Sequence, residues 1–156
     1  MRIELLFLGR TREGFYAEGI AEYSRRLARY VPVEIRTVKE RRLAGHGAEE
    51  RRRQEEGRQL LAAVSRPTFL VVLDGRGAAM GSEELARRLG EWTEAGGGRL
   101  SFVLGGPSGL ADAVLAAAGQ VLSLSAMTLP HELARLVLVE QLYRALTIRA
   151  GHLYHR

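Results

Sequence analysis

The sequence predicts an α/β fold in which helices cover both faces of a parallel sheet. The first observation is that apolar runs of strand length alternate with helical patterns along all 156 residues, as in folds built from strand–helix–strand units. The second is the run at residues 68–73, which is apolar without polar alternation and is typical of a central parallel strand. The third is that no repeat or linker is visible, so we expect a single domain over residues 1–156.

The first half of the chain predicts two strands and two helices. Residues 3–8 are an apolar run that favours a buried strand. A helix is indicated next by an apolar stripe at helical spacing, made of Tyr16, Ile20, Tyr23, Leu27 and Tyr30. Pro32 opens a short second strand with alternating apolar and charged residues. The charged stretch 39–58 predicts a helix that buries little before Leu60 and Leu61.

The second half repeats this alternation and ends in the longest helix. Strands are predicted at residues 68–73, 100–104 and 121–124, and helices at residues 82–94, 111–118 and 130–149. Ser82 is a good N-cap residue for the first of these helices. Pro130 lies near the first position of the last helix, which proline favours.

The strand order along the chain predicts where a ligand would bind. In open parallel sheets, ligands bind outside the carboxyl ends of the strands. That rule selects the three loops that follow Leu73, Leu104 and Leu124.

The composition favours a polyanionic partner and excludes several chemistries. The net charge is +5 and the calculated isoelectric point is about 10.2, with Lys39 the only lysine, so nucleic acid is favoured as a partner. The chain has no cysteine, which excludes disulfides and thiolate nucleophiles. No apolar run is long enough to span a bilayer and residues 1–8 are too short for a signal-peptide core, so we expect a cytoplasmic protein with no membrane partner.

Two glycine motifs follow predicted strands. Residues 75–77 read Gly-Arg-Gly, but Met80 stands where a dinucleotide-binding fingerprint needs its third glycine, so a tight turn is the better interpretation. Residues 105–109 read Gly-Gly-Pro-Ser-Gly and lack the lysine of a phosphate-binding loop. On this motif alone, a structural turn and a ligand loop remain equally open.

No metal site is predicted. The run at residues 131–135 begins like a zinc-protease helix, but Arg135 replaces the second histidine. His152 and His155 are three residues apart without a neighbouring carboxylate, which makes a metal there improbable.

The last helix and the tail carry further signals. The helix at 130–149 is apolar on most of its surface, so part of its cover is expected to come from a second subunit. Glu140 and Arg144 are spaced for an intrahelical ion pair. The tail at 152–156 has the groups needed to stack on a base and contact phosphate, but on this motif alone a frayed terminus is the preferred interpretation.

Several segments together resemble a known family. The segments are residues 73–74, 105–109, 124–131, 135–145 and 154–156, which occur in the right order. The chain closely resembles the bacterial ribosomal large-subunit pseudouridine methyltransferase H family, part of the SPOUT class. The resemblance covers essentially the whole chain and is most specific in the C-terminal third.

The resemblance implies a fold and an activity. Members have an α/β fold with a deep C-terminal trefoil knot, here within approximately residues 70–156. They bind S-adenosyl-L-methionine in the knot, act as homodimers, and methylate N3 of a pseudouridine in 23S ribosomal RNA, preferentially in the assembled ribosome.

The resemblance also implies site residues. The cofactor would be surrounded by Leu73, Gly106, Ser125, Ala126, Met127, Thr128, Leu129 and Pro130. We expect the tail residues Tyr154, His155 and Arg156 to close over the base, in a site that two subunits could share. Arg135 and Arg144 are candidates for anion contacts. Arg10 and Leu153 depart from the family pattern of lysine and proline, which affects local geometry more than activity.

Three other functions compete with this one. A non-enzymatic ribosome-binding protein of the same fold is disfavoured by the intact glycines and the 125–130 loop. A knotted methyltransferase acting on transfer RNA often has an extra RNA-binding domain, for which this chain has no room. A nucleotide-dependent oxidoreductase is the weakest alternative, because the fingerprint around Gly75 fails.

Overall fold

The computed structural model describes residues 1–155, and at His155 the backbone alone. It contains one five-stranded sheet in the order β2-β1-β4-β3-β5, and every neighbouring pair is parallel. The strands are β1 Arg2–Leu8, β2 Val33–Val38, β3 Phe69–Ala79, β4 Arg99–Leu104 and β5 Gln120–Ser123. The helices are α1 Gly14–Leu27, α2 Ala48–Ala63, α3 Ser82–Ala95, α4 Asp112–Ala116 and α5 His131–Arg149, followed by the short 3₁₀ helix η1 Leu153–His155. The predicted α/β class is confirmed.

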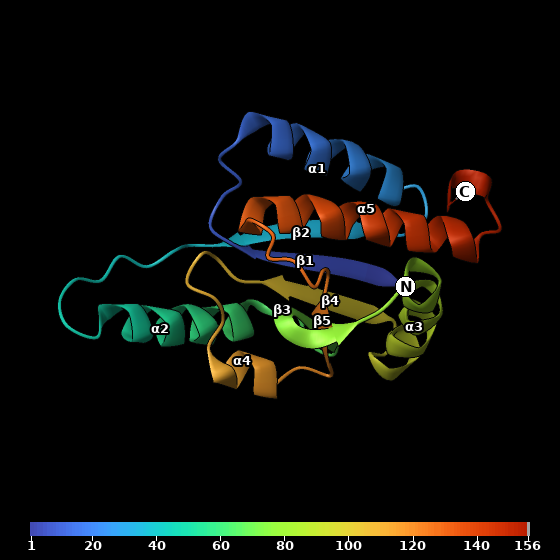
Figure 1. Ribbon diagram of the computed structural model, residues 1–156. Coiled ribbons are helices and arrows are strands. Elements are labelled where there is room, and N and C mark those ends of the chain that lie inside the picture. The colour runs from blue at the N-terminus through green and yellow to red at the C-terminus, as the bar shows by residue number, and fades with distance from the viewer. Residues whose placement is uncertain (156) are drawn as a thin grey trace.

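Helices cover both faces of the sheet (Figure 1). Because successive side chains of a strand point to opposite faces, Leu5 and Phe7 of β1 face one core while Leu6 and Leu8 face the other. Helices α1, α3 and α5 pack over the first core, and α2 and α4 over the second. The near-continuous apolar runs of β1, β3 and β4 follow from burial on both sides.

Strand β3 is longer than predicted, and the tight turn expected at residues 75–77 is wrong. The strand continues to Ala79 through an irregularity, because Leu73 and Ala78 both pair with Leu122 of β5. A Cβ atom on Gly77 would lie 2.6 Å from the backbone of Val121. Glycine at this position permits the close approach of β5, which is a common reason for glycine in a bulged strand.

Two helix predictions also need correction. Ser82 is the first residue of α3 and Gly81 is its N-cap, while the Ser82 hydroxyl donates to Oε1 of Gln141 at 2.6 Å. Ser82 therefore joins α3 to α5 and does not cap its own helix. The helix predicted at residues 111–118 is shorter, since α4 spans Asp112–Ala116.

The charged stretch 39–58 forms helix α2 from Ala48 onward and buries more than predicted. Glu56 and Gly57 are buried together with Leu60. The Glu56 carboxylate accepts a hydrogen bond from the backbone N–H of Arg41 at 2.9 Å, so it holds the segment that precedes the helix.

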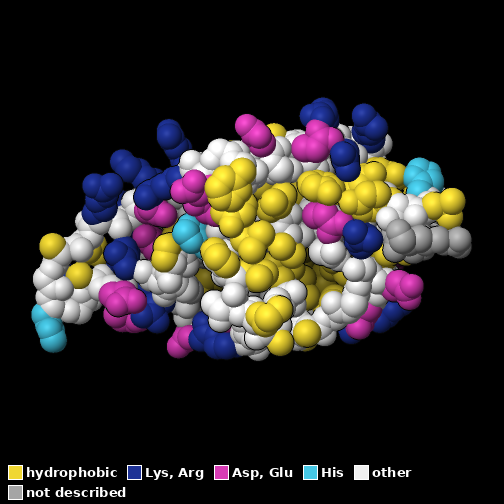
Figure 2. Space-filling view, turned by 45° about the horizontal axis from the view of Figure 1, so that its top comes forward, with side chains coloured by type: hydrophobic (Ala, Val, Ile, Leu, Met, Phe, Trp, Pro, Cys, Tyr) yellow, Lys and Arg dark blue, Asp and Glu magenta, His cyan; other side chains and the backbone are white. Residues whose placement is uncertain are grey.

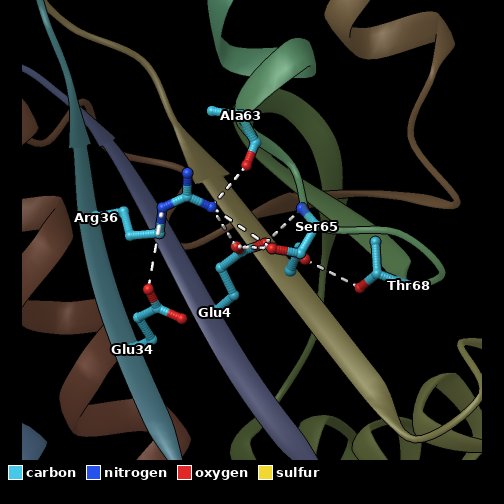
Figure 3. Close-up of polar contacts among 7 residues, drawn as sticks. Glu4, Glu34, Arg36, Ala63, Ser65 and Thr68 are labelled. Carbon is cyan, nitrogen blue, oxygen red and sulfur yellow. Dashed lines mark hydrogen bonds and ion pairs between the residues drawn. The ribbon is translucent and has the colours of Figure 1, made fainter.

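A buried carboxylate fastens the connection between α2 and β3 to the sheet (Figure 3). Glu4 of β1 is 2% exposed and accepts hydrogen bonds from Ser65 Oγ at 2.7 Å, Ser101 Oγ at 2.7 Å and Arg36 Nη1 at 2.9 Å. Burial alone would raise the pKa of Glu4, but the hydrogen bonds from Ser65, Ser101 and Arg36 outweigh it and lower this pKa below its usual value. Glu4 is therefore a buried, charged and hydrogen-bonded group.

None of the helices in the described part of the chain is both long and apolar enough to cross a membrane.

Candidate cofactor and substrate site

A cavity of about 370 Å³ lies at the carboxyl ends of β3, β4 and β5. This volume is within the range of pockets that bind small molecules and cofactors. Three segments that the strand-end rule selects bound the cavity: residues 73–75, 104–110 and 122–131. The first is not the expected loop, because residues 73–75 lie at the irregularity inside β3, where the pairing of β3 with β4 ends. Figure 2 shows apolar side chains gathered in a hollowed region on the middle of this face.

Seven of the eight residues predicted to bind the cofactor line this cavity: Leu73, Gly106, Ser125, Ala126, Met127, Thr128 and Leu129. Pro130 is not among the lining residues and is the N-cap of α5. The sequence reasoning did not assign Asp74, Gly105, His131 or Ala134, which also line the cavity. Asp74, Gly105 and His131 are sequence neighbours of predicted residues, and this adjacency could have identified them as lining residues.

The loop after β5 is held by its own serines. The hydroxyl of Ser123 donates to the carbonyl oxygen of Ser125 at 3.0 Å, and the hydroxyl of Ser125 accepts from the backbone N–H of Met127 at 3.0 Å. This arrangement leaves the Met127 side chain 77% exposed at the rim. Residues 124–130 lie outside helices and strands, so their backbone groups can serve as ligand contacts.

The loop after β4 makes a tight glycine turn. The N–H of Gly109 donates to the carbonyl oxygen of Gly106 at 3.1 Å, and Gly109 has φ of +75°, a conformation that favours glycine. A Cβ on Gly105 would lie 2.8 Å from the side chain of Leu110. The glycines therefore give this wall a surface that is mostly backbone.

Asp74 is the only acidic residue among the described residues that line the cavity. Its carboxylate accepts from the Arg76 side chain at 2.8 Å and from the Arg76 backbone N–H at 2.9 Å. The hydrogen bond from the Arg76 side chain is the main reason that the pKa of Asp74 lies below its usual value. Asp74 is therefore an ionised carboxylate that forms an ion pair with Arg76 in the irregular part of β3.

His131 brings an imidazole to the opposite wall. Burial, with the nearby Arg135 cation as the next cause, lowers the pKa of His131 below its usual value. This shift favours the neutral imidazole, which can accept or donate a hydrogen bond.

Arg135 does not present its guanidinium to the cavity or to solvent, which corrects its expected role as an anion contact. The side chain is fully buried and lies 5.0 Å above the ring of Phe7. It donates to the carbonyl oxygens of Leu8 and Gly9 and to Thr11 Oγ1. Arg135 therefore positions the loop between β1 and α1.

The tail lies at the other end of α5. The hydroxyl of Tyr154 lies 3.3 Å from both Tyr23 Oη and Glu140 Oε1, and its ring packs against Tyr143. Burial raises the pKa of Tyr154, and the hydrogen bond with Tyr23 raises it further. Within one chain, Tyr154 is therefore not brought to the cavity. Arg156 lies outside the described residues, and so does the side chain of His155.

The predicted ion pair of α5 is confirmed. Arg144 Nη2 lies 2.8 Å from Glu140 Oε1, and the Arg144 guanidinium lies 4.9 Å above the Tyr154 ring. Hydrogen bonding to Glu140 is the main reason that the pKa of Arg144 is raised. Arg144 of α5 therefore packs against the tail through the ring of Tyr154.

The cavity has the chemistry that an adenosyl cofactor requires. Apolar walls come from Leu73, Leu122 and Leu129, which suit a flat purine. The glycine turn and the 124–130 loop supply backbone polar groups, and Asp74 supplies one ionised carboxylate. Such a site can hold a nucleoside while leaving one side open to a second substrate.

Comparison with known proteins agrees with this geometry. A family model described as predicted SPOUT methyltransferase matches residues 1–155. The chain is 47% identical over 156 residues to the ribosomal RNA large subunit methyltransferase H of Anaeromyxobacter sp. (strain Fw109-5), with all of both chains covered. The protein of the same name from Desulfotalea psychrophila is 42% identical, again over all of both chains.

A solved structure shares the fold. A probable methylase family protein from Haemophilus influenzae Rd KW20 superposes with a TM-score of 0.55 at 14% identity, covering 96% of this chain and 68% of that one. The fold and the site thus define a methyltransferase of the SPOUT class. Within this class, the chain belongs to the ribosomal RNA large subunit methyltransferase H family.

Proposed function

We propose that this protein transfers a methyl group from S-adenosyl-L-methionine to N3 of a pseudouridine in 23S ribosomal RNA. The observation that carries the proposal is the cavity at the ends of β3, β4 and β5, which contains seven of the eight residues expected from the family resemblance. Full-length relatives named for methylation of large-subunit ribosomal RNA support the substrate class. The protein would act in the cytoplasm, where assembled ribosomes are found.

The cofactor would be held by the two loops that follow β4 and β5. Gly106 and Leu129 would flank the adenine, and Leu73 would pack beside it. When bound, S-adenosyl-L-methionine would supply the methyl group of its sulfonium. The rest of the cofactor would leave as a neutral thioether. The carboxylate of Asp74, although paired with Arg76, would favour binding of the positively charged donor.

The acceptor must lose a proton for the methylation to balance. N3 of pseudouridine carries a hydrogen, so a base takes this proton as the bond from N3 to the methyl carbon forms. The protein's contribution to the displacement is chiefly to hold donor and acceptor in line. His131 is better suited to take this proton than the ionised Asp74 of the same cavity wall, because Asp74 is paired with Arg76 and its pKa is lowered.

We propose that the tail completes the site of a second subunit. Helix α5 is roughly 28 Å long, with the cavity at its first turn and Tyr154 beside its last turns. A twofold axis that pairs two α5 helices in opposite directions would bring Tyr154, His155 and Arg156 of one protomer toward the cavity of the other. Such an isologous contact is the usual form of a homodimer.

We also propose that residues 1–156 form one domain whose region from about residue 70 onward is knotted. The family resemblance supports this, and the three segments that bound the cavity all come from that region.

The test is transfer of a labelled methyl group to assembled ribosomes and to separated subunits from a strain without this activity. We expect label on a pseudouridine of the large-subunit RNA, at N3. Tyr154→Phe and His155→Ala should each lower kcat at least 10-fold with unchanged cofactor affinity, as for groups that act on the acceptor. Label confined to transfer RNA, or cofactor binding without transfer to ribosomes, would refute the proposed substrate.

A further inference from the structure

We propose that residues 39–53 form a basic arm that binds the phosphates of the substrate RNA beside the cofactor cavity. The inference rests on the proposed function and adds to it the surface that holds the RNA. The arm comprises the irregular segment 39–47 and the first turns of α2, and it extends away from the body of the molecule (Figure 1).

The arm is strongly positive. It contains six basic and three acidic residues. Lys39, Arg42 and Arg51 are exposed, and no carboxylate lies within 4.0 Å of their charged groups among the side chains that the structure describes. Figure 2 shows Lys and Arg side chains gathered at the end of the molecule where this segment lies.

The acidic residues of the arm are already paired or lie on α2. Glu40 pairs with Arg12 at 3.1 Å, and Glu50 pairs with Arg53 at 3.3 Å. Pairing leaves the exposed Lys39, Arg42 and Arg51 without a described carboxylate partner, although Arg51 Nη2 also donates to the carbonyl oxygen of Ala44 at 3.2 Å. Arginine and lysine on one face are the electrostatic footprint of nucleic-acid binding.

One hydrogen bond and the placement of the Glu40 carboxylate beside two glycines bring the arm near the cavity. Arg52 Nη2 of α2 donates to Ser108 Oγ in the loop after β4 at 2.5 Å. The Glu40 carboxylate lies against Gly9, where a Cβ would be only 2.5 Å from Oε1, and a Cβ on Gly106 would lie 3.9 Å from the same oxygen. A backbone bound along the arm would therefore pass next to the lining residue Gly106.

The charge and shape of the arm fit the backbone of a helical RNA segment. Double-helical RNA is bound mainly through its shape and through phosphate and 2′-hydroxyl contacts, for which spaced cations suffice. An extended arm gives such contacts away from the reacting base. The arm would hold the stem while the cavity and tail act on the loop nucleotide.

The test compares two triple variants of equal charge change. The arm variant is Lys39→Gln, Arg42→Gln and Arg51→Gln. The control is Arg2→Gln, Arg29→Gln and Arg66→Gln, three exposed arginines without a described carboxylate partner that lie near the amino ends of the strands, at the other end of their own sheet from the arm. Fluorescence anisotropy measures binding of a labelled RNA hairpin over a range of KCl concentrations.

The arm variant should bind the hairpin on the order of 100-fold more weakly at about 0.1 M salt, with a salt slope smaller by about 2 to 3. The control should change far less, and cofactor binding measured by calorimetry should be unchanged in both. Equal loss in both variants would show that only net charge matters and would overturn the inference. Weaker binding to ribosomes with unchanged hairpin binding would assign the arm to ribosomal protein and would also overturn it.

The arm inference and the proposed methyl transfer can fail independently, and the experiments distinguish the two failures. If the wild-type protein methylates ribosomes and the arm variant has the same KM, the arm inference alone fails. If the wild-type protein transfers no methyl group but its hairpin binding depends on the arm, the proposed reaction fails and the arm stands.

Discussion

At Gly106 the cavity wall has little room for a side chain. A Cβ there would lie 3.2 Å from Leu8 Cδ2, so a larger side chain is directed against Leu8 or into the cavity. We expect Gly106→Val to weaken S-adenosyl-L-methionine binding at least 10-fold, measured by isothermal titration calorimetry. Gly81→Val is the matched control, because a Cβ at Gly81 meets nothing within 4 Å. Equal affinity in the two variants would contradict this placement of the cofactor.

Arg135 illustrates a buried charge whose two terminal nitrogens donate to backbone and hydroxyl oxygens, while its Nε has no hydrogen-bond partner among the described residues. Burial lowers the pKa of Arg135, and the carbonyl oxygens of Leu8 and Gly9 accept its hydrogen bonds. Lysine cannot reproduce this planar fork. We expect Arg135→Lys to lower the free energy of unfolding by about 1 to 3 kcal/mol, measured by urea denaturation.

Arg144→Lys is the comparison for Arg135→Lys, because Arg144 is partly exposed and its partner Glu140 is a side chain. Its effect should stay below about 1 kcal/mol. A similar loss in both variants would show that burial of Arg135 is not the cause.

At the scale of the secondary-structure elements, Glu4 joins β1 to β4 and to the connection between α2 and β3 (Figure 3). Because its folded-state pKa is lowered, its stabilisation is present above the pKa of the unfolded chain and is lost as the pH falls through the folded value. We expect Glu4→Gln to cost about 1 to 3 kcal/mol at pH 7 and to flatten the acid side of the stability profile.

The control for this prediction is Glu34→Gln on the neighbouring strand β2. The Glu34 side chain is 66% exposed and lies 4.0 Å from Arg36. Denaturation followed from about pH 3 to pH 7 should show a normal acid slope in this variant. An unchanged slope in Glu4→Gln would mean that other carboxylates govern the acid transition.

At the scale of the whole molecule, helix α5 has one side that the chain does not cover fully. Leu133, Val137 and Ile148 are half-buried on a stripe that also contains Gln141 and Arg144. Figure 2 shows apolar side chains on this face. If two subunits meet here, Val137→Arg should give a monomer in size-exclusion chromatography with light scattering.

The same variant should lose methyl transfer at least 10-fold while keeping cofactor affinity, because the tail of the partner would no longer reach the cavity. Arg87→Ala on α3, an exposed position whose described ion pairs are with Glu84 and Glu91 of the same helix, should remain dimeric. A fully active Val137→Arg monomer would remove the shared site from the proposal.

The alternation of buried runs and helical stripes was sufficient to predict the parallel sheet, because periodicity reflects local burial directly. The cavity could be placed as well, since the carboxyl ends of β3, β4 and β5 must lie at one edge of such a sheet. The pairing of Glu140 with Arg144 followed from their spacing within one helix.

Other features depended on contacts between segments far apart in the chain. Gly77 was expected in a turn, but the approach of β5 keeps it in a strand. Ser82 was expected to cap α3, but its hydroxyl donates a hydrogen bond to Gln141 of α5. Arg135 has the sequence signature of an anion contact, and only the fold shows that it is buried against the loop after β1.

The amino-acid sequence therefore determined the fold class, the elements that form it and the edge of the sheet where the site lies. These properties arise from residues near one another in the chain. The tertiary structure decided which polar groups are buried, which loops touch and that Tyr154 lies at the far end of α5 from the cavity. Those properties depend on distances between residues separated by up to the whole length of the chain, and local patterns carry no information about them.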